Sequence, residues 1–386
     1  MNKVMCLNFG WEHIKYIEGL REFKSDIVLY NCTLDRTVFA NWPASITYLD
    51  KMPSEDVVMW SVENKVAHCI SDQCDYSVQL HAKIASAIPC FGPSVKGSSI
   101  SRDKLLQRQF GKYLEFCLTP LFSLAWSSDD IRVFFRNHGD CVVKPRDSRG
   151  SFGVSIVDSE EHIEEAFLKA LSCSDSNQII VEKFVEGQEF SVDVLLHGEV
   201  KILGVGLKYQ YDKVKTVSKA IVYHLECLEL FGNAESVVRE VCEVFDYRYG
   251  LAHLEFIITP NGEVYLIEGS NRGGGGLTST VVMSNVCGFS SYDFYLRSCI
   301  GKAVKLFDFQ PNSSSVALRF FDHPDQVLDT RTNGLNFVKI KSTQYQTKDT
   351  KLTDASRPGF FIVKGCKDRF KSIKEFVLEI DSCLKD

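Results

Sequence analysis

The first 90 residues alternate short apolar runs with segments whose apolar positions recur at helical spacing. The runs 4–10 and 26–32 predict strands, segment 11–23 predicts a helix, and segment 69–87 ends in another. This alternation is typical of a small parallel α/β unit. Residues 90–100, rich in Gly, Pro and Ser, predict a linker that closes the unit.

The middle of the chain predicts an α+β unit with hairpins. We expect one helix to begin near Ser101, with Asp103 in its first turn, and to run to about Phe116. Ser159 can cap an amphipathic helix at 159–172. The apolar runs that predict strands lie at 140–146, 153–157, 178–185, 189–198 and 200–208.

A second hairpin follows a predicted helix at 234–248. Its strands are expected at 251–260 and 263–269, and the dipeptide Asn261-Gly262 between them is a strong turn signal. Four glycines at 273–276 then break the pattern, and a last segment predicts strands near 315–321 and 359–364 and a helix at 370–384.

Composition and charge narrow the function classes. The 386 residues carry 44 basic and 50 acidic side chains, a net charge of −6, so no basic surface points to nucleic acid. No apolar run approaches the roughly 18 residues that a membrane helix needs. The 14 cysteines form no C-x-x-C pair, and without a leader segment they predict a reducing cytoplasm. No G-x-G-x-x-G follows the first strand, which disfavours a dinucleotide site.

Two glutamates on the second hairpin are the sharpest candidates for chemistry. Glu255 lies six residues before Asn261 and Glu268 six after Gly262, so we expect them to face each other across the hairpin. Facing carboxylates repel unless a cation lies between them, and hard oxygen ligands favour magnesium. Two exposed glutamates at a strand edge are the plainer alternative.

Further polar positions suit a phosphate-bearing ligand. Lys144 ends an apolar strand, and the 146–153 loop (RDSRGSFG), which contains Ser151, could close over phosphates, although an ordinary solvated loop has the same composition. The segment 181–189 offers a strand edge for an adenine and, with Glu182 and Glu189 among its acids, a carboxylate for a ribose. Arg272 precedes the 273–276 glycine run and could hold a carboxylate or phosphate.

The order of these residues resembles the ATP-grasp superfamily. The resemblance covers about residues 100–300 and is most specific in AHLEFIITPNGEVYLIEGSNRGGGG. The tail at 357–368 resembles the closing domain of the biotin-carboxylase-like and L-amino-acid ligase branch. The fold class implied is α/β and α+β: an ATP-grasp fold with a Rossmann-like α/β domain before it and a small C-terminal α+β domain after it. The boundaries expected are 1–98, 99–300 with a lid at about 134–208, and 301–386.

The resemblance also assigns roles by position. Lys104, Lys144 and the loop residue Ser151 would contact the ATP phosphates, and Glu189 would hold the ribose. Glu182, Lys183 and Val185 would form the adenine edge, the latter two through their backbone. Glu255 and Glu268 would bind Mg²⁺, with Mn²⁺ as an alternative, and Arg272 and Lys208 would act on the transferred phosphate or the acyl phosphate. A surface position is an equal alternative for Lys208, and a structural role is the preferred reading of His253.

One position departs from the family pattern. The last motif usually reads Glu-x-Asn-x-Arg, but here Ser270 stands where Asn is expected and Asn271 follows it. The third metal ligand is therefore Asn271 through a shifted backbone, Ser270, or water.

The function implied is an ATP- and Mg-dependent ligase that joins a small-molecule carboxylate to an amine, on amino-acid substrates, with release of ADP and phosphate. A homodimer is expected by analogy alone. The alternatives are a carboxylase or purine-type ligase that activates bicarbonate or formate, and a nucleotide-binding pseudoenzyme.

Overall fold

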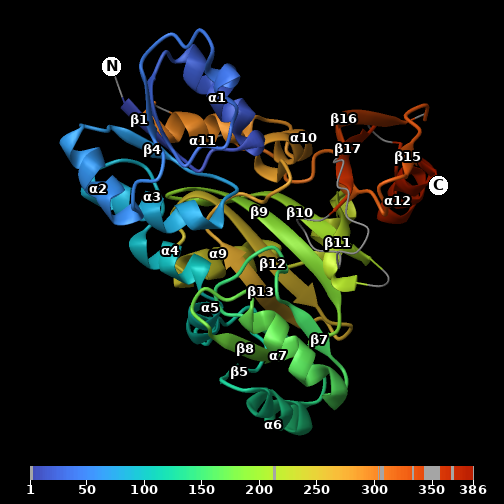
Figure 1. The fold of residues 1–386 in the computed structure, drawn as a ribbon. Coiled ribbons are helices and arrows are strands. Elements are labelled where there is room, and N and C mark those ends of the chain that lie inside the picture. The colour runs from blue at the N-terminus through green and yellow to red at the C-terminus, as the bar shows by residue number, and fades with distance from the viewer. Residues whose placement is uncertain are drawn as a thin grey trace.

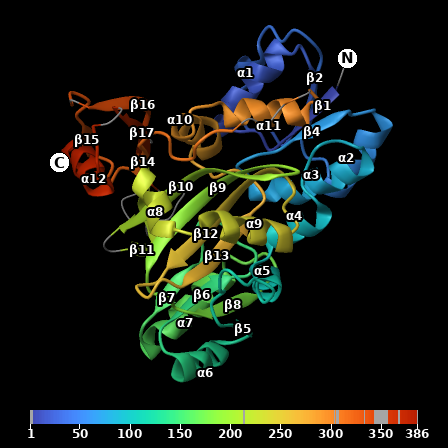
Figure 2. The ribbon, with the colours of Figure 1, turned by 180° about the vertical axis from the view of Figure 1, so that it is seen from behind.

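The computed structural model describes residues 3–211, 214–302, 304, 308–332, 334–342, 357–366 and 369–385. The described strands form an N-terminal sheet, a small sheet that we call the lid, a large central sheet, and a two-stranded pair of β15 (Val327–Leu328) with β18 (Leu384–Lys385). The central sheet lies between the N-terminal unit and the lid, and the C-terminal strands lie beside its far end (Figures 1 and 2).

The N-terminal unit is the predicted parallel α/β unit. Its strands lie in the order β3-β2-β1-β4, and each neighbouring pair is parallel. Nearly every position of β1 and β2 is buried, as expected for parallel strands covered on both faces. The bounds are β1 (Lys3–Leu7), β2 (Asp26–Tyr30), β3 (Ile46–Leu49), β4 (His68–Ile70), α1 (Ile14–Glu22), α2 (Ser54–Glu63) and α3 (Asp75–Ala87).

Two helices replace the linker and the single helix predicted after this unit. The linker prediction for 90–100 is wrong, because Ser94 caps α4 (Val95–Arg102) by accepting the Gly97 N–H at 2.8 Å. The continuous helix from Ser101 to Phe116 is also wrong. Asp103 is extended, and its carboxylate accepts the N–H groups of the next turn, so it starts a new helix, α5 (Lys104–Gly111).

The lid is a four-stranded antiparallel sheet in the order β5-β8-β6-β7, with two helices packed on it. It lies at the bottom of Figure 1. The lid sheet spans residues 122–183, whereas we expected a lid at about 134–208, because the strands after 187 pair with the central sheet instead. The bounds are β5 (Phe122–Ala125), α6 (Ser128–His138), β6 (Cys141–Pro145), β7 (Ser155–Val157), α7 (Ile163–Leu171) and β8 (Ile179–Lys183).

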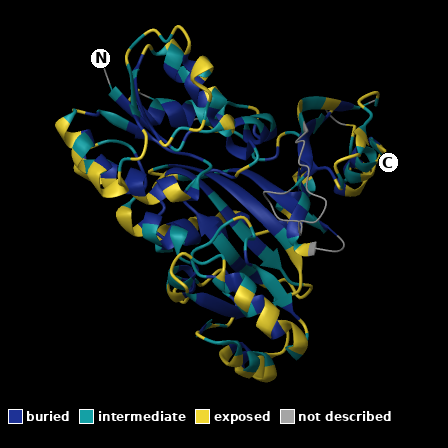
Figure 3. Ribbon diagram, in the orientation of Figure 1, coloured by how far each residue is buried: buried dark blue, intermediate teal, exposed yellow. Residues whose placement is uncertain are grey.

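The central sheet has eight described strands in the order β13-β12-β9-β10-β11-β14-β17-β16. It carries core on both faces: Val192 and Val194 of β9 pack with the helix α9 (Ala234–Val244), and Leu195 packs with the N-terminal unit. Its strands are accordingly among the most buried parts of the molecule (Figure 3). The bounds are β9 (Gln188–His197), β10 (Val200–Tyr211), β11 (Val214–Tyr223), β12 (Tyr249–Ile258), β13 (Val264–Ser270), β14 (Val316–Phe320), β16 (Leu335–Ser342) and β17 (Gly359–Gly365).

The C-terminal strands β14, β16 and β17 extend the central sheet, and they confirm the strands predicted near 315–321 and 359–364. The predicted boundary at residue 300 stays a prediction. The remaining helices are α8 (Leu225–Phe231), α9 (Ala234–Val244), α10 (Met283–Val286), α11 (Ser291–Cys299) and α12 (Ile373–Ser382). No helix in the described ranges is long and apolar enough to cross a membrane.

Candidate active site

A cavity of about 670 Å³ is bounded by the central sheet, the lid, the N-terminal unit and the C-terminal strands. It gathers residues that are up to 349 positions apart, from Trp11 to Phe360. All but one of the predicted site residues line it. These are Lys104, Lys144, Ser151, Glu182, Lys183, Val185, Glu189, Lys208, Glu255, Glu268 and Arg272.

The two hairpin glutamates face each other as predicted. Glu255 of β12 pairs directly with Glu268 of β13, and the sheet has an irregularity immediately after Glu255. Their side chains are 25% and 30% exposed, enough to present oxygen atoms to the cavity. Lys104 Nζ lies 3.2 Å from Glu268 Oε1, so the α5 N-terminus brings a cation to this carboxylate.

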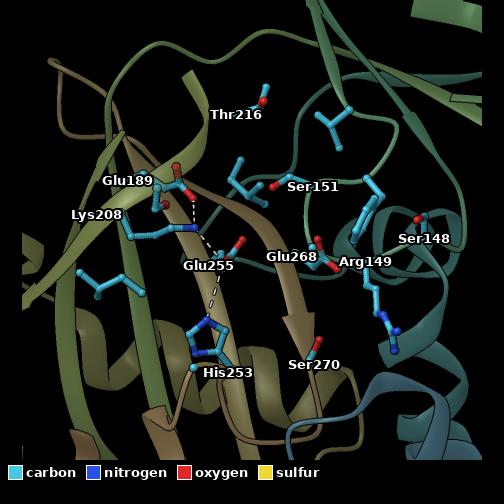
Figure 4. A pocket seen from close by; sticks show the side chains of 18 of the residues that line it. Ser148, Arg149, Ser151, Glu189, Lys208, Thr216, His253, Glu255, Glu268 and Ser270 are labelled. Carbon is cyan, nitrogen blue, oxygen red and sulfur yellow. Dashed lines mark hydrogen bonds and ion pairs between the residues drawn. The ribbon is translucent and has the colours of Figure 1, made fainter. Parts of the chain in front are cut away.

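Lys208 of β10 is part of the site and not a surface lysine. Its Nζ donates to Glu255 Oε1 at 2.8 Å and also pairs with Glu189, as Figure 4 shows. Burial opposes ionisation of Glu255, but the charges of Lys208 and His253 outweigh it and hold the Glu255 pKa well below its usual range. Glu255 therefore stays charged beside Lys208.

His253 contacts the buried carboxylate of Asp193. Its Nδ1 lies 2.8 Å from Asp193 Oδ1 on β9, and its Nε2 lies 3.6 Å from Glu255. Burial disfavours the imidazolium, but Asp193 and Glu255 overcome this and raise the His253 pKa to about 9. The contacts fit the structural role preferred for His253, in which it braces the Glu255 carboxylate.

On the lid side, a buried ion network fixes Lys144 and Glu182. Glu182 Oε2 accepts from Lys144 Nζ at 2.7 Å, and Arg108 of α5 adds bonds of 2.7 and 3.1 Å. Burial opposes ionisation of Glu182, yet the charges of Arg108 and Lys144 lower its pKa. Burial, aided by the nearby Arg108 and Lys104, lowers the Lys144 pKa in turn.

The backbone after β8 forms the edge expected to meet an adenine. The Lys183 N–H donates to the Leu121 carbonyl at 2.8 Å, and the Phe184 N–H donates to Asp140 at 2.9 Å. In the described part of the chain, no hydrogen-bond acceptor is found for the Val185 N–H. The edge at 183–185 can thus offer the Val185 N–H to a flat ligand.

The 146–153 loop covers the cavity from the lid. Lys104 Nζ donates to the Ser148 carbonyl at 2.6 Å, and Arg146 pairs with Asp103, so the loop is tied to the start of α5. Gly150 and Ser151 both have positive φ, of 57° and 59°. Gly153 has φ +75°, and a Cβ there would come within 2.7 Å of Pro145, so only glycine fits this sharp return.

At the opposite wall, the N-terminal unit holds Arg272. Its guanidinium makes two bonds of 2.9 Å with Asp75 at the start of α3. Asp72, in the same loop, accepts the Gly273 N–H at 2.8 Å and also bonds Ser279. The glycine run and Arg272 are therefore positioned by the N-terminal unit.

Asn271 is the one predicted site residue that does not line the cavity. The Asn271 side chain is buried outside the cavity lining and donates to the backbone carbonyls of Tyr249 and Leu251, at 3.2 and 2.9 Å. Side chains alternate along β13, so Ser270 shares the Glu268 face and lines the cavity. The Asn271 Oδ1 finds no hydrogen-bond partner among the described residues, but it is buried away from the cavity lining. Which of Ser270, Asn271 and water would be the third metal ligand stays a prediction, and the cavity lining favours Ser270 or water.

Comparison with known families identifies the domain around this cavity. Residues 138–281 match the family model of the ATP-grasp domain. The chain contains an ATP-grasp domain. The matched stretch runs from the end of α6, through the lid strands and the hairpin, to the glycine run, so it holds most of the site.

Two proteins of known structure have the same fold as this chain. The L-amino acid ligase of Bacillus licheniformis superposes with a TM-score of 0.78 at 18% identity, covering 100% of this chain and 98% of that one. The biotin carboxylase domain of the Hydrogenobacter thermophilus 2-oxoglutarate carboxylase, solved with MgADP and bicarbonate, gives 0.70 at 17% identity, covering 94% and 86%. These likenesses establish the ATP-grasp fold with the preceding α/β unit.

A curated relative is the D-alanine–D-alanine ligase of Saccharophagus degradans. It is 28% identical over 190 residues, which are 47% of this chain and 59% of that ligase. The chain thus spans about three fifths of the length of this relative.

The ATP-grasp domain meets the chemical requirements of a magnesium nucleotide. Mg²⁺ binds through one or two carboxylates and completes its shell with phosphate oxygens and water. Glu255 and Glu268 offer two carboxylates, and among the described residues no cluster of three or more His, Cys, Asp or Glu side chains could hold a metal alone. Three lysines around them, Lys104, Lys144 and Lys208, suit the phosphates.

Some residues of the site were not found from the sequence. No sequence pattern indicated Arg108 as a site residue, because an arginine in an amphipathic helix is usually exposed. In the structure it is fully buried. Asp72 and Asp75 follow β4 at the carboxyl end of a parallel strand, where ligand sites gather, and that position could have indicated them. Gln73 between them lines the cavity at φ +52°, and its amide finds no partner among the described residues.

Proposed function

We propose that this chain is an ATP- and Mg-dependent ligase that joins a carboxylate to an amine through an acyl phosphate, with amino acids as substrates. The observation that carries the proposal is the Glu255–Glu268 pair, which faces the same cavity as three lysines and Arg272. The ATP-grasp domain match and the amide-forming relatives support it.

The nucleotide end of the cavity lies between the lid and the central sheet. The 183–185 backbone would accept the adenine, and Glu189 the ribose hydroxyls, once Lys208 turns toward the phosphates. Lys104 and Lys144 would hold the phosphates beneath the 146–153 loop. Glu255 and Glu268 would hold Mg²⁺, which when bound supplies positive charge to the phosphate oxygens.

In the first step, an oxygen of the substrate carboxylate attacks the γ-phosphorus of ATP. The bond from the γ-phosphorus to the bridging oxygen breaks, and ADP leaves with the electron pair. Arg272, kept in place by Asp75, would face the growing negative charge of the acyl phosphate.

In the second step, the amine nitrogen attacks the acyl carbon. The carbon–oxygen bond breaks, phosphate leaves with the electron pair, and the nitrogen loses a proton as the amide forms. The protein groups position the reactants and exclude water, and closure of the 146–153 loop is the movement that would exclude it.

The test is ADP release in the presence of ATP, Mg²⁺ and a panel of amino-acid pairs. We expect ADP and phosphate in equal amounts, a ligated product by mass, and a hydroxamate when hydroxylamine replaces the amine. Release of AMP instead of ADP would indicate adenylation and would contradict the proposal. No nucleotide turnover across the panel would favour a nucleotide-binding pseudoenzyme.

The assembly and location of the protein stay predictions. The carboxylase relative was solved as a domain dimer, and a homodimer is proposed here on that likeness alone. A reducing cytoplasm is proposed from the cysteine content.

A further inference from the structure

The first strand of the lid sheet, β5, has one edge that no other described strand pairs with. The sheet runs β5-β8-β6-β7, so β5 is bonded to β8 on one side only. In Figures 1 and 2, β5 and α6 lie at the end of the molecule opposite the N-terminal unit, which therefore does not cover this edge. An open edge presents backbone N–H and C=O groups that can pair with another strand.

The backbone groups that face outward belong to Phe122 and Leu124. The Lys183 N–H donates to the Leu121 carbonyl at 2.8 Å, so Leu121 bonds to β8. Alternate residues of an antiparallel strand bond to opposite sides. Ser123 therefore also bonds to β8, whereas Phe122 and Leu124 direct their N–H and C=O groups to the open edge. The Leu124 carbonyl accepts the Ser123 hydroxyl at 3.2 Å and keeps a second lone pair for another donor.

This edge lacks the charges with which exposed strands usually prevent pairing. The chain has no Asp, Glu, Lys or Arg from 116 to 128. The same stretch holds four large apolar side chains that are 46–67% exposed: Phe116, Leu118, Leu121 and Trp126. An uncharged edge beside exposed apolar side chains is typical of a surface that contacts another protein.

A second copy of β5 complements the edge, because it presents the same outward groups. When two copies run antiparallel with Ser123 opposite Ser123, Phe122 of each copy lies opposite Leu124 of the other. Both of these pairs can exchange N–H···O bonds, so every outward group of the two strands is satisfied. The arrangement has a two-fold axis and closes on itself, which is the commonest symmetry of protein dimers.

Other registers leave groups unpaired. Sliding one strand by two residues sets Leu124 opposite Pro120, which has no N–H to donate. Sliding it the other way sets Phe122 opposite Trp126, whose N–H already donates to the Asp130 carboxylate at 2.8 Å. A slide by one residue sets outward groups opposite residues that bond to β8. The register with Ser123 on the axis is therefore the one that the backbone favours.

The charges at the two ends of β5 favour the same antiparallel arrangement. The exposed Lys112 has its Nζ 5.8 Å from the centroid of the Phe122 ring, at the start of the strand. The other end leads into α6, whose first turn carries Asp129. Asp129 is 84% exposed, although it also pairs with Arg132 of its own helix. Antiparallel pairing brings the Lys112 end of each copy to the Asp129 end of the other, where opposite charges attract.

We propose that the open edge of β5 is the interface between two copies of this chain, which pair antiparallel about a two-fold axis at Ser123. The pairing joins the two lid sheets into one continuous sheet and brings the exposed Leu121 of each copy opposite Ala125 of the other. The surface and the register go beyond the homodimer proposed from the carboxylase likeness. They do not depend on the ligase function, because 122–124 lie outside the cavity lining.

The experiment measures self-association by sedimentation velocity at protein concentrations between about 1 and 100 µM. We expect the wild type to form dimers at the upper end of this range. Ser123→Lys sets two positive charges opposite each other at the axis, and we expect it to weaken self-association at least about tenfold. Ser123→Glu should do the same with negative charges. Ser172→Lys adds the same charge at an exposed serine after α7 and should behave as wild type.

A mixture of the two charged variants tests the register and the identity of the partner together. Equimolar Ser123→Lys and Ser123→Glu should form a heterodimer at least as stable as the wild-type dimer, because opposite charges then meet at the axis. Restored association also shows that both variants are folded, and circular dichroism of each variant alone checks this separately.

Three results would overturn the proposal. The first is a wild type that stays monomeric up to about 100 µM. The second is a dimer that survives in Ser123→Lys, which places the contact on another face, or one that Ser172→Lys loses to the same extent. The third is a mixture of the charged variants that stays monomeric. None of these results bears on the ligase function, since no measurement depends on turnover.

Discussion

At the scale of single residues, burial decides what each glutamate of the site can do. Glu182 is 2% exposed, and its carboxylate is bonded to Lys144 and Arg108, so it holds the lid strand in place beside the proposed adenine edge. Glu255 and Glu268 are of the same residue type but remain open to the cavity. The open pair is therefore the one proposed as metal ligands, because its oxygen atoms reach the cavity.

We expect Glu268→Ala to abolish turnover, by at least about a thousandfold, and to leave the fold intact. The substitution removes one of two proposed metal ligands, and its position is open enough that no packed core is lost. ADP release and circular dichroism measure the two effects. Glu263→Ala, an exposed glutamate on the same hairpin, is the control. An active Glu268→Ala variant would show that the metal assignment is wrong.

A buried histidine makes stability depend on pH. His81 bonds Ser71 Oγ at 2.9 Å and the Phe91 carbonyl at 3.1 Å, and burial lowers its pKa to about 4. Between pH 6.5 and pH 4, His81 is therefore protonated in the unfolded chain but neutral in the folded chain. Stability from this group is therefore complete above pH 6.5 and is lost as the pH falls through 4.

Between pH 6.5 and pH 4 the unfolding free energy should fall by about 3 kcal/mol because of His81, since one pKa unit corresponds to about 1.4 kcal/mol. Urea unfolding of the wild type and of His81→Gln at pH 7, 5.5 and 4.5 measures it. The difference in unfolding free energy between the two proteins should shrink as the pH falls. A difference independent of pH would mean that His81 titrates normally.

At the scale of elements, one ion network joins α5 to the lid strands β6 and β8. Arg108 donates to Glu182 and, at 2.5 Å, to the Ile267 carbonyl of β13, so it also reaches the hairpin that carries Glu255 and Glu268. The network ties the lid strands β6 and β8, through α5, to β13 of the central sheet. Its three charged side chains are almost fully buried, which makes each of them dependent on the others.

Glu182→Gln should therefore destabilise the protein by about 3–5 kcal/mol, because it leaves Arg108 and Lys144 buried without their counter-charge. Chemical denaturation measures the change, and the midpoint should fall clearly below that of the wild type. Glu186→Gln, an exposed neighbour in the same segment, should leave the midpoint in place. A midpoint shift of equal size in both variants would contradict the ion-network account.

At the scale of the whole molecule, the N-terminal unit completes the active site. Asp72 lies in the loop after β4 and Asp75 is the first residue of α3. They precede the Gly273 and Arg272 that they hold by 201 and 197 positions. The loop fixes a glycine-rich segment that has no side chains of its own to order it. Docking of the two units therefore sets the geometry of the reacting end.

For Asp75→Asn, we expect kcat to fall about 10- to 100-fold with the KM for ATP nearly unchanged. The Arg272 guanidinium loses its two-bond partner and with it a fixed orientation, whereas the nucleotide end is not touched. Steady-state kinetics separate the two constants. Asp56→Asn, exposed on α2, is the control. A change in the ATP KM alone would place Asp75 in nucleotide binding instead.

The sequence predicted some parts of this structure well, because they depend on local signals. Asn261-Gly262 set the hairpin turn, and strand alternation then placed Glu255 opposite Glu268. The same local reasoning failed at Asp103, where a side-chain cap divides one predicted helix into two. It also failed to choose between Ser270 and Asn271, because these two neighbours differ in the direction in which their side chains point at the end of β13.

The sequence by itself determined many of the strands and helices, the ATP-grasp pattern and most of the candidate residues, because periodicity and motif order are properties of the chain. Only the tertiary structure decided which charges are paired, that Arg108 is buried, and that Lys341 meets Trp11 across 330 positions. Such pairings depend on how separate units dock, and the free energy of a charge depends on what the docked units place beside it.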